Sequence, residues 1–380
     1  MISVRFRWVL LSTVALLCCR CGTVLHGQAL PERAIVASAA EFDPKPDEVV
    51  LHYYGSGGWG ILWRGAYIVA APYFSNHSIL DIAADTVAPK PDAARAGLQG
   101  TPFRAMTALL IGHGHIDHAG DVPLLMELQP FDRPPVLVAD VSTVHLLAGL
   151  HKKFSCIDPV LHHQSGIVRD KCAIGSPQPV ARIAAVQSDH APHVEIRGIG
   201  VSAFVGSHDR PLTRLPSSAK DFVLGQTWAF VIDLLDEKEK PVFRIHYVDA
   251  APNAPHGLIA LPLAAARDVD VHIGCMPGHD LVQGYPTELL KQNNVRYVIG
   301  AHWEDFFHDR SATLKPLEFV LNQDNMESFL TKVEASLGTT PGPVAPVPDP
   351  RCQQPGTCGP SGARWAVPVP GQTLRFRVGL

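Results

Sequence analysis

Apolar residues occur in short runs along most of the chain, separated by polar or glycine-containing turns. Three early runs are short and closely spaced, which is typical of strands in a β-meander. Further along, strand-type runs alternate with segments that have the spacing of amphipathic helices. We expect strands at 48–54, 61–64, 67–70, 106–111, 136–139, 182–186, 198–205, 227–234, 242–248 and 295–300. We expect helices at 121–128, 142–150, 287–292 and 326–337.

Strands interleaved with helices on this scale predict sheets covered by helices, that is, an α/β domain built in layers. We place this main domain at 30–337. Within it, the His- and Pro-containing stretch 151–179 is interpreted as an irregular insertion. The remainder, 338–380, is interpreted as a tail that begins with a stiff proline-rich linker at 338–350. Its last part, 366–378, has the pattern of an edge strand.

The composition is that of a globular protein with a sizeable core. Hydrophobic residues make up 46% of the chain and charged residues 18%, which excludes a disordered or fibrous protein. The formal charge of −4 comes without a basic block. This argues against nucleic acid as a partner.

Residues 1–29 have the pattern of a signal peptide. Two arginines precede the apolar run 8–19, and small residues lead up to a cleavage site after Ala29. A run of about 12 residues is too short to span a bilayer, where about 20 are needed. We therefore expect export to the periplasm or the extracellular space, with an uncleaved N-terminal anchor as the alternative. A lipoprotein anchor is not favoured, because Arg20 precedes Cys21 where a small residue is wanted.

Several cysteines lie beyond this leader, and an exported protein can form disulfides. Short spacings favour the pairs Cys156–Cys172 and Cys352–Cys358 and leave Cys275 unpaired. Spacing alone does not fix the connectivity.

The strongest chemical signal follows the strand expected at 106–111. Three imidazoles and a carboxylate, His113, His115, Asp117 and His118, stand within six residues between glycines. Alternate residues of an extended segment face the same side, so His113 and His115 can bind one ion together. Asp117 and His118 can then reach a second ion. Zinc, iron and manganese all accept such ligands. The flanking glycines argue against a surface histidine cluster, because they let the backbone turn closely around an ion.

This His-x-His-x-Asp-His motif resembles the first metal motif of the metallo-β-lactamase superfamily. The resemblance implies a four-layer αββα sandwich with two metal ions at one edge, between the sheets. It also implies three further ligands at the ends of later strands: a His, an Asp that bridges both ions, and a last His.

Three positions of the chain match that order. His190 follows the strand at 182–186 and is our choice for the next ligand, with His193 as a rival and His208 as a weaker third. Asp249 stands at the end of the strand at 242–248, where a carboxylate can touch both ions. His302 ends the strand at 295–300.

The resemblance assigns the ligands in two groups joined by one acid. One ion would take His113, His115 and His190, and the other Asp117, His118 and His302, with Asp249 between them. The resemblance implies two divalent ions, zinc first, with iron or manganese as alternatives. A water held by both ions would be acidified to hydroxide near neutral pH, with Asp117 and Asp249 counted as catalytic.

The substrate is predicted only as a class. An aspartate at position 249 favours relatives that act on phosphodiesters, lactones or thioesters over true β-lactamases. Residues 302–307 also resemble a His-Trp-Glu-Asp-Phe-Phe signature of one branch of the superfamily. Within this segment, Glu304 and Asp305 are candidates to orient His302 by hydrogen bonds, which metal-binding histidines usually need. We expect a small-molecule or lipid-like ester. His279 is a candidate to contact substrate or protonate a leaving group, the alternative being a solvated loop residue.

Two other classes of function remain as alternatives. The first is an iron-dependent oxidoreductase of the same fold, similar to persulfide dioxygenases; no flavin-binding segment supports the oxygen-reducing kind. The second is a non-catalytic binding protein on a decayed scaffold. The intact set of seven ligands argues against the second.

Overall fold

The computed structural model describes residues 42, 44–128, 130–175, 178–192, 204–309, 314–317, 326–338 and 364–378. Several predictions fall on residues outside these ranges. They are the leader, most of the linker, most of the strand expected at 198–205, the pair Cys352–Cys358 and the rival ligand His193. No helix of the described part is long and apolar enough to cross a membrane.

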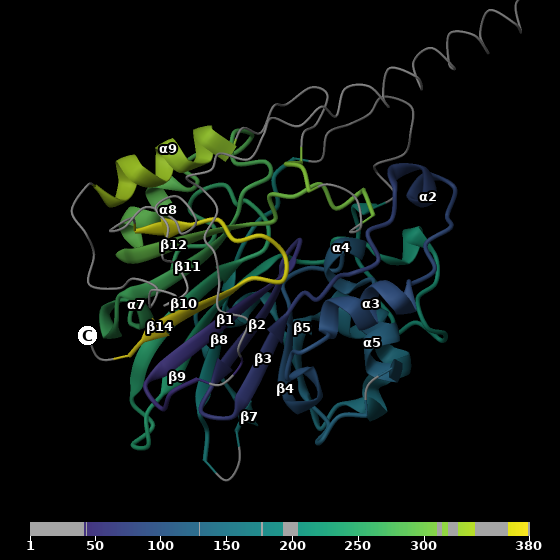
Figure 1. The fold of residues 1–380 in the computed structure, drawn as a ribbon, viewed down its shortest axis with the longest axis horizontal. Helices are drawn as coiled ribbons and strands as arrows, with labels where there is room; N and C mark the ends of the chain where they lie inside the picture. Colours follow the sequence, from purple (N-terminus) through teal and green to yellow (C-terminus); the bar gives the residue numbers. More distant parts are fainter. Residues whose placement is uncertain are drawn as a thin grey trace, which may run out of the picture.

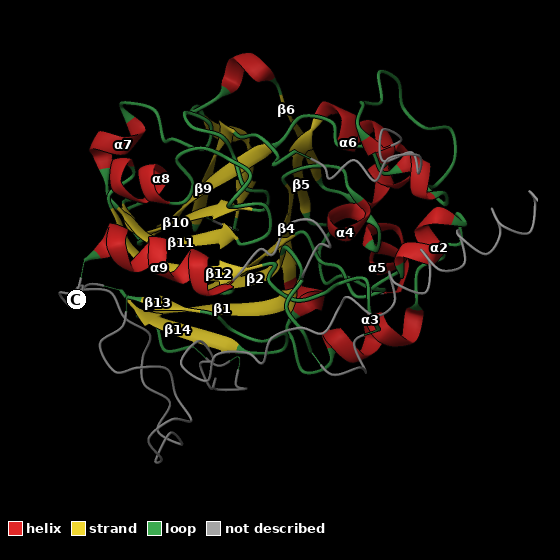
Figure 2. Ribbon diagram, turned by 90° about the horizontal axis from the view of Figure 1, so that it is seen from above, coloured by secondary structure: helices red, strands yellow, loops and turns green. Residues whose placement is uncertain are grey.

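Two seven-stranded sheets lie face to face (Figures 1 and 2). The first sheet has the order β14 (Thr373–Arg377), β1 (Glu48–Gly55), β2 (Gly58–Trp63), β3 (Ala66–Ala70), β4 (Met106–Ile111), β5 (Val136–Asp140) and β6 (Cys156–Val160). The second has the order β13 (Trp365–Ala366), β12 (Val295–Ala301), β11 (Val269–Cys275), β10 (Pro241–Val248), β9 (Trp228–Leu235), β8 (Ala181–Gln187) and β7 (Val168–Ile174).

Helices cover the outer face of each sheet, as the view from above in Figure 2 shows. The first sheet carries α2 (Ile79–Ala83), α3 (Pro91–Leu98), α4 (Ile116–Ala119), α5 (Val122–Leu128) and α6 (Val141–Leu146). The second carries α7 (Leu263–Ala266), α8 (Thr287–Gln292) and α9 (Met326–Leu337). The prediction of a four-layer αββα sandwich is confirmed.

Strands in the middle of this arrangement are buried on both faces, which explains their nearly continuous apolar sequences. In β1, Leu51 and Tyr53 belong to the core between the sheets, whereas Val50 and Tyr54 pack under the helices of the first sheet. All eight residues of β1 are buried. Burial of apolar surface on both sides of each sheet is the main favourable term for this fold.

The direction of the strands gathers several loops at one edge of the sandwich. β4 runs parallel to β3 and β5, while β10 runs parallel to β11, which is in turn parallel to β12. β8 and β10 are both antiparallel to β9, so they share a direction. The chain segments that leave β8, β10 and β12 therefore emerge at the same edge of the second sheet. These are the segments that carry the later candidate ligands.

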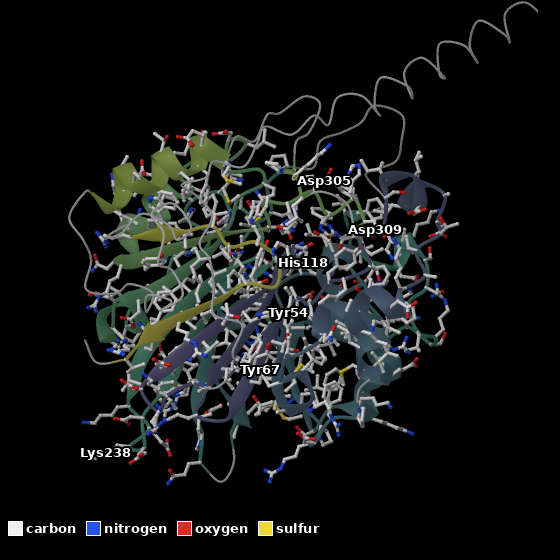
Figure 3. The ribbon with its side chains drawn as sticks, in the orientation of Figure 1. Tyr54, Tyr67, His118, Lys238, Asp305 and Asp309 are labelled. Carbon is white, nitrogen blue, oxygen red and sulfur yellow. A yellow bond between two sulfur atoms is a disulfide. The ribbon has the colours of Figure 1, made fainter. Side chains whose placement is uncertain are left out.

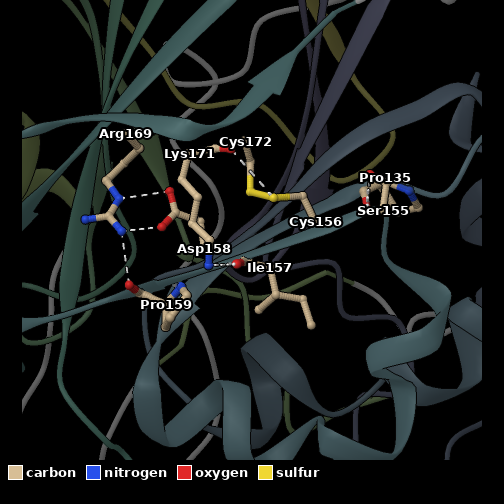
Figure 4. Close-up of a disulfide and its surroundings, with 9 residues drawn as sticks. All are labelled: Pro135, Ser155, Cys156, Ile157, Asp158, Pro159, Arg169, Lys171 and Cys172. Atoms are coloured by element: carbon tan, nitrogen blue, oxygen red, sulfur yellow. Dashed lines mark hydrogen bonds and ion pairs between the residues drawn. A yellow bond between two sulfur atoms is a disulfide. The ribbon is translucent and has the colours of Figure 1, made fainter.

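The expectation of an irregular insertion at 151–179 is wrong. This stretch contains β6 and β7, the last strand of each sheet. The disulfide Cys156–Cys172 joins these two strands with a Cα–Cα distance of 5.9 Å, and it is the pair that the spacing predicts (Figure 4). These two strands were not predicted because edge strands lack the usual apolar pattern. β7 is largely exposed, and β6 contains a proline, which an edge position tolerates.

The C-terminal segment completes both sheets. β13 pairs with β12 in the second sheet, and β14 pairs with β1 in the first. The edge strand expected at 366–378 is thus present as β14. This part of the predicted tail belongs to the sandwich itself.

Candidate metal centre

The first four candidate ligands lie where β4 leaves the first sheet. His113 and His115 precede α4, and Asp117 and His118 lie in its single turn. All four are buried. Gly112 allows the end of β4 to lie next to Asp249, because a Cβ at position 112 would lie 2.4 Å from Oδ2 of Asp249. Only glycine lets the end of β4 pass so close to the later acid.

The first group of metal-type donors consists of His113, His115 and His190, with one ligand atom of each within 4.8 Å of the others. Nε2 of His113 lies 3.1 Å from Nδ1 of His115. Nδ1 of His190 lies 2.7 Å from the carbonyl oxygen of Ala191. Because a carbonyl only accepts, Nδ1 of His190 carries the proton and Nε2 keeps the lone pair that a metal ligand needs.

The second group consists of Asp117, His118 and His302. Nε2 of His302 lies 3.0 Å from Oδ2 of Asp117 and 3.3 Å from Nε2 of His118. These residues come from α4 and from the end of β12, so the group joins the two sheets at their common edge.

Asp249 lies between the two groups. Its Oδ1 is 3.2 Å from Nδ1 of His113, and its Oδ2 is 3.5 Å from Nδ1 of His118. A third group of metal-type donors accordingly contains His113, His118 and Asp249. Each oxygen of one carboxylate thus faces a histidine of a different group.

These residues fit two divalent cations. Buried polar atoms without a partner are costly, yet Oδ2 of Asp249 and Nδ1 of His118, which face each other, have no hydrogen-bond partner among the described residues. Five imidazoles and two carboxylates form the donor set, which suits zinc, iron or manganese. Burial and the neighbouring His118 hold the pKa of His113 well below its usual range, so this imidazole is neutral, as a ligand must be.

The two carboxylates differ in their surroundings. Burial raises the pKa of Asp249, and the nearby histidines only partly oppose this effect. Burial alone would also raise the pKa of Asp117, but His118 and His302 hold it well below its usual range. The side chain of Asp117 is 11% exposed and that of Asp249 is 0% exposed. Asp117 is therefore the acid of this pair that solvent reaches.

Aromatic residues form a wall beside the second group. The ring of Phe306 lies 4.9 Å from that of His302, and Phe306 also packs with Tyr73 and Leu317 in a small apolar cluster. A cavity of about 1160 Å³ is lined by residues that include Glu304, Asp305 and Asp309. Figure 3 shows His118 near the middle of the molecule, with Asp305 and Asp309 above it in this view.

Two histidines considered from the sequence lie outside the three groups. Nε2 of His208 contacts the carbonyl oxygen of Asp221 at 2.6 Å. Nδ1 of His279 contacts the carbonyl oxygen of Met276 at 2.8 Å, and its Nε2 lies 3.4 Å from Oγ of Ser328 on α9. His279 is buried, so the alternative of a solvated loop residue is wrong, and neither histidine belongs to a donor group in the described part.

Sequence reasoning missed the part of the site contributed by the turn between β1 and β2. A Cβ on Gly57 would lie 2.5 Å from the ring of His118, and the hydroxyl of Tyr247 donates to the carbonyl oxygen of Gly57 at 2.8 Å. The glycine-rich sequence predicts a turn here, but nothing local relates it to a histidine 61 positions later. Only the packing of the strands brings them together.

No family model matches the chain, and no curated protein does either. Solved structures with a similar arrangement are known, at low identity. Igni18, a metallo hydrolase from the archaeon Ignicoccus hospitalis KIN4/I, is 14% identical with a TM-score of 0.47 and covers 87% of this chain and 99% of its own. The metallo-β-lactamase fold protein YhfI from Bacillus subtilis is 9% identical with a TM-score of 0.47, over 87% of this chain and 100% of its own. CmlA, a diiron β-hydroxylase from Streptomyces venezuelae, is 13% identical with a TM-score of 0.35; the match covers 68% of this chain and 46% of CmlA. Identities this low bear on the fold alone.

Proposed function

We propose that the protein is a metal-dependent hydrolase that binds two divalent ions at the edge between its sheets. The proposed ligands are His113, His115, Asp117, His118, His190, Asp249 and His302. The observation that carries the proposal is the position of Asp249, whose two oxygens face one histidine from each group. A carboxylate so placed can hold two ions at the short separation, about 3.5–4 Å, that two-metal hydrolases use.

Two ions bound here would lower the pKa of a water between them and polarise an ester oxygen of the substrate. The chain's own residues prepare this chemistry. His190 presents Nε2 because its Nδ1 is held by Ala191. Asp117 is the acid that solvent reaches, so it is placed to accept a hydrogen bond from an incoming water. Phe306 shields the side of His302 from water.

For the substrate, we propose a phosphodiester, a lactone or another ester, of small-molecule or lipid-like character. An acid at the bridging position supports this class, as does the apolar wall of Tyr73, Phe306 and Leu317 beside the second group. We further propose that the protein acts outside the cytoplasm. The signal-type leader supports export, and the disulfide Cys156–Cys172 is compatible with an oxidising compartment.

An iron-dependent oxidoreductase is the second candidate, because the same imidazoles and carboxylates also suit iron. The two candidates differ in what the purified protein contains and does. Metal analysis of the mature protein comes first, followed by assays with phosphodiester, lactone and thioester substrates.

We expect about two ions per chain, loss of hydrolysis on chelation, and its return with zinc or manganese. Iron with visible absorbance, together with oxygen consumption and no ester hydrolysis, would favour the second candidate. A protein that binds no ion would contradict both.

A further inference from the structure

The ligand His302 has a backbone conformation that needs support. Its φ is 61°, in the left-handed region that residues other than glycine rarely adopt, because Cβ crowds the backbone there. Such a conformation persists when the surrounding structure holds it. It allows the chain to leave β12 abruptly and turns the ring towards Asp117 and His118.

The support comes from β1, 249 positions earlier in the chain. The backbone N–H of His302 donates to the hydroxyl oxygen of Tyr53 at 2.9 Å. That hydroxyl donates to Oε2 of Glu304 at 2.5 Å. The backbone N–H of Ser56 donates to Oε1 of Glu304. Tyr53, Ser56 and Glu304 thus connect the first hairpin to the segment that holds His302.

Each member of this network is fixed in place. Tyr53, Ser56, Glu304 and His302 are all buried. The ring of Tyr53 packs against that of Trp59 at 4.8 Å in the core between the sheets, which fixes the hydroxyl. A hydrogen bond from a phenol to a carboxylate is short and strong when the acid is ionised.

The same hairpin also restrains a second ligand. Gly57 packs directly against the ring of His118, and Tyr247, from the strand that leads to Asp249, donates to its carbonyl oxygen. Two of the three members of the second donor group therefore contact the hairpin of β1 and β2, His302 through Tyr53 in β1 and His118 through Gly57 in the turn.

We propose that Tyr53 and Glu304 are positioning residues for the second metal ion. They fix the backbone of His302 so that its Nε2 meets Asp117 and His118, and they act through His302 without touching ion or substrate. The inference rests on the proposed two-metal function. It predicts that the two ions respond differently to changes at Tyr53 and Glu304.

The test uses Tyr53→Phe, Glu304→Gln and Glu304→Ala in the full-length protein. Tyr67→Phe is the matched control: Tyr67 is also a buried tyrosine of the first sheet, and its hydroxyl lies 2.6 Å from that of Tyr54. For each variant, the metal-free protein is titrated with zinc against a competing chelator, which gives an affinity for each site. Far-UV circular dichroism checks the fold.

Loss of a residue that orients a metal ligand typically costs about 10–100-fold in metal affinity. We expect this loss at one of the two sites, the second, in Tyr53→Phe and Glu304→Ala. Glu304→Gln should lose less than Glu304→Ala, because its amide oxygen still accepts from Ser56. The affinity of the first site should change by less than about threefold in every variant, and Tyr67→Phe should leave both sites unchanged.

Equal affinities in wild type, Tyr53→Phe and both Glu304 variants would overturn the inference, as would an equal loss at both sites. If Tyr53→Phe does not fold, Glu304→Gln decides, since it replaces one oxygen by an NH₂ group. Failure of the proposed function looks different: the wild-type protein itself would then bind fewer than two ions.

Discussion

Two sets of buried histidines in the described part of the chain differ in chemistry. One is the candidate metal centre. The other is the pair His246 and His272, which are register partners on the adjacent strands β10 and β11, with Nδ1 atoms 3.2 Å apart. Both members of the pair are 0% exposed. Asn293 approaches Nδ1 of His246 at 3.4 Å, and Nε2 of each ring has no hydrogen-bond partner among the described residues.

The difference between the two sets is the presence of carboxylates. Burial and then the nearby Arg244 lower the pKa of His246 to about 3, and burial and His246 hold that of His272 well below its usual range. A neighbouring cation makes the pair a poor place for another cation. In the metal centre, Asp117 and Asp249 provide negative charge beside the imidazoles. Buried imidazoles in contact are therefore not sufficient for a metal site; acids must stand with them.

The largest expected effect comes from removing the acid between the two donor groups. Asp249→Ala should reduce the bound metal below two ions per chain and lower turnover by more than the roughly 100-fold that loss of an orienting residue costs. His302→Ala should behave similarly, since it strips one ligand from the second ion. Both variants should fold, because the layered core does not depend on the ions. Metal content and initial rates on the best ester found provide the measurement.

His246→Gln is the matched control for this experiment, because it replaces an equally buried imidazole in the strand that leads to Asp249. It should keep two ions and wild-type turnover. Full activity and two ions in Asp249→Ala would show that this acid does not join the sites. A loss of metal in His246→Gln would abolish the distinction between the two sets.

The fold was largely predictable, because short strand-type runs alternate with helical segments and so indicate sheets covered by helices, while the resemblance of the His-x-His-x-Asp-His motif implied four layers. The central strand β11 was not predicted. Its sequence alternates apolar residues with Asp270 and His272, which looks like a half-exposed segment, yet both polar side chains are buried. Their partners, Arg244 and Arg267 for Asp270 and His246 for His272, lie on other segments. Sequence alone does not show that a polar position has a partner across the sheet.

The same limit applies to the site. The motif from His113 to His118 is local, so its chemistry is visible in the sequence. Asp249 and His302 could be found only from the order of motifs in a resembling family. The contributions of Gly57 and Tyr53 depend on packing between the two sheets, and no local signal marks them.

A second prediction concerns acid stability and tests the pair directly. The folded pKa of His246 lies far below the usual 6.5, so the unfolded chain binds more protons once the pH falls below 6.5. The stability that neutral His246 contributes is present in full above pH 6.5 and is lost as the pH falls from there towards 3. At pH 5 one such histidine lowers the free energy of unfolding by about 2 kcal/mol, because each pH unit below 6.5 costs about 1.4 kcal/mol.

Urea unfolding of the metal-free protein at pH 7 and pH 5 measures this loss. His246→Gln should lose about 2 kcal/mol less than wild type between these pH values, while contributions of the metal-centre histidines cancel in the comparison. An identical loss in both proteins would mean that His246 is not held neutral by its surroundings.

The smallest effect is expected at His279, a buried histidine that belongs to neither set. Its Nδ1 is held by the carbonyl oxygen of Met276, its Nε2 lies near Ser328 and Asp280, and its ring packs on Phe329 at 5.4 Å. These contacts tie the loop after β11 to α9. His279→Ala should therefore reduce the free energy of unfolding by about 1–2 kcal/mol, the value of one or two hydrogen bonds. Metal content should stay at two ions, and kcat should change by less than about threefold.

If His279 instead transferred a proton during catalysis, kcat of His279→Ala would fall by about 10²–10⁴ with metal content unchanged. That result would support the catalytic role that the sequence suggested, because packing against α9 does not account for such a fall in kcat when the protein is folded and binds both ions.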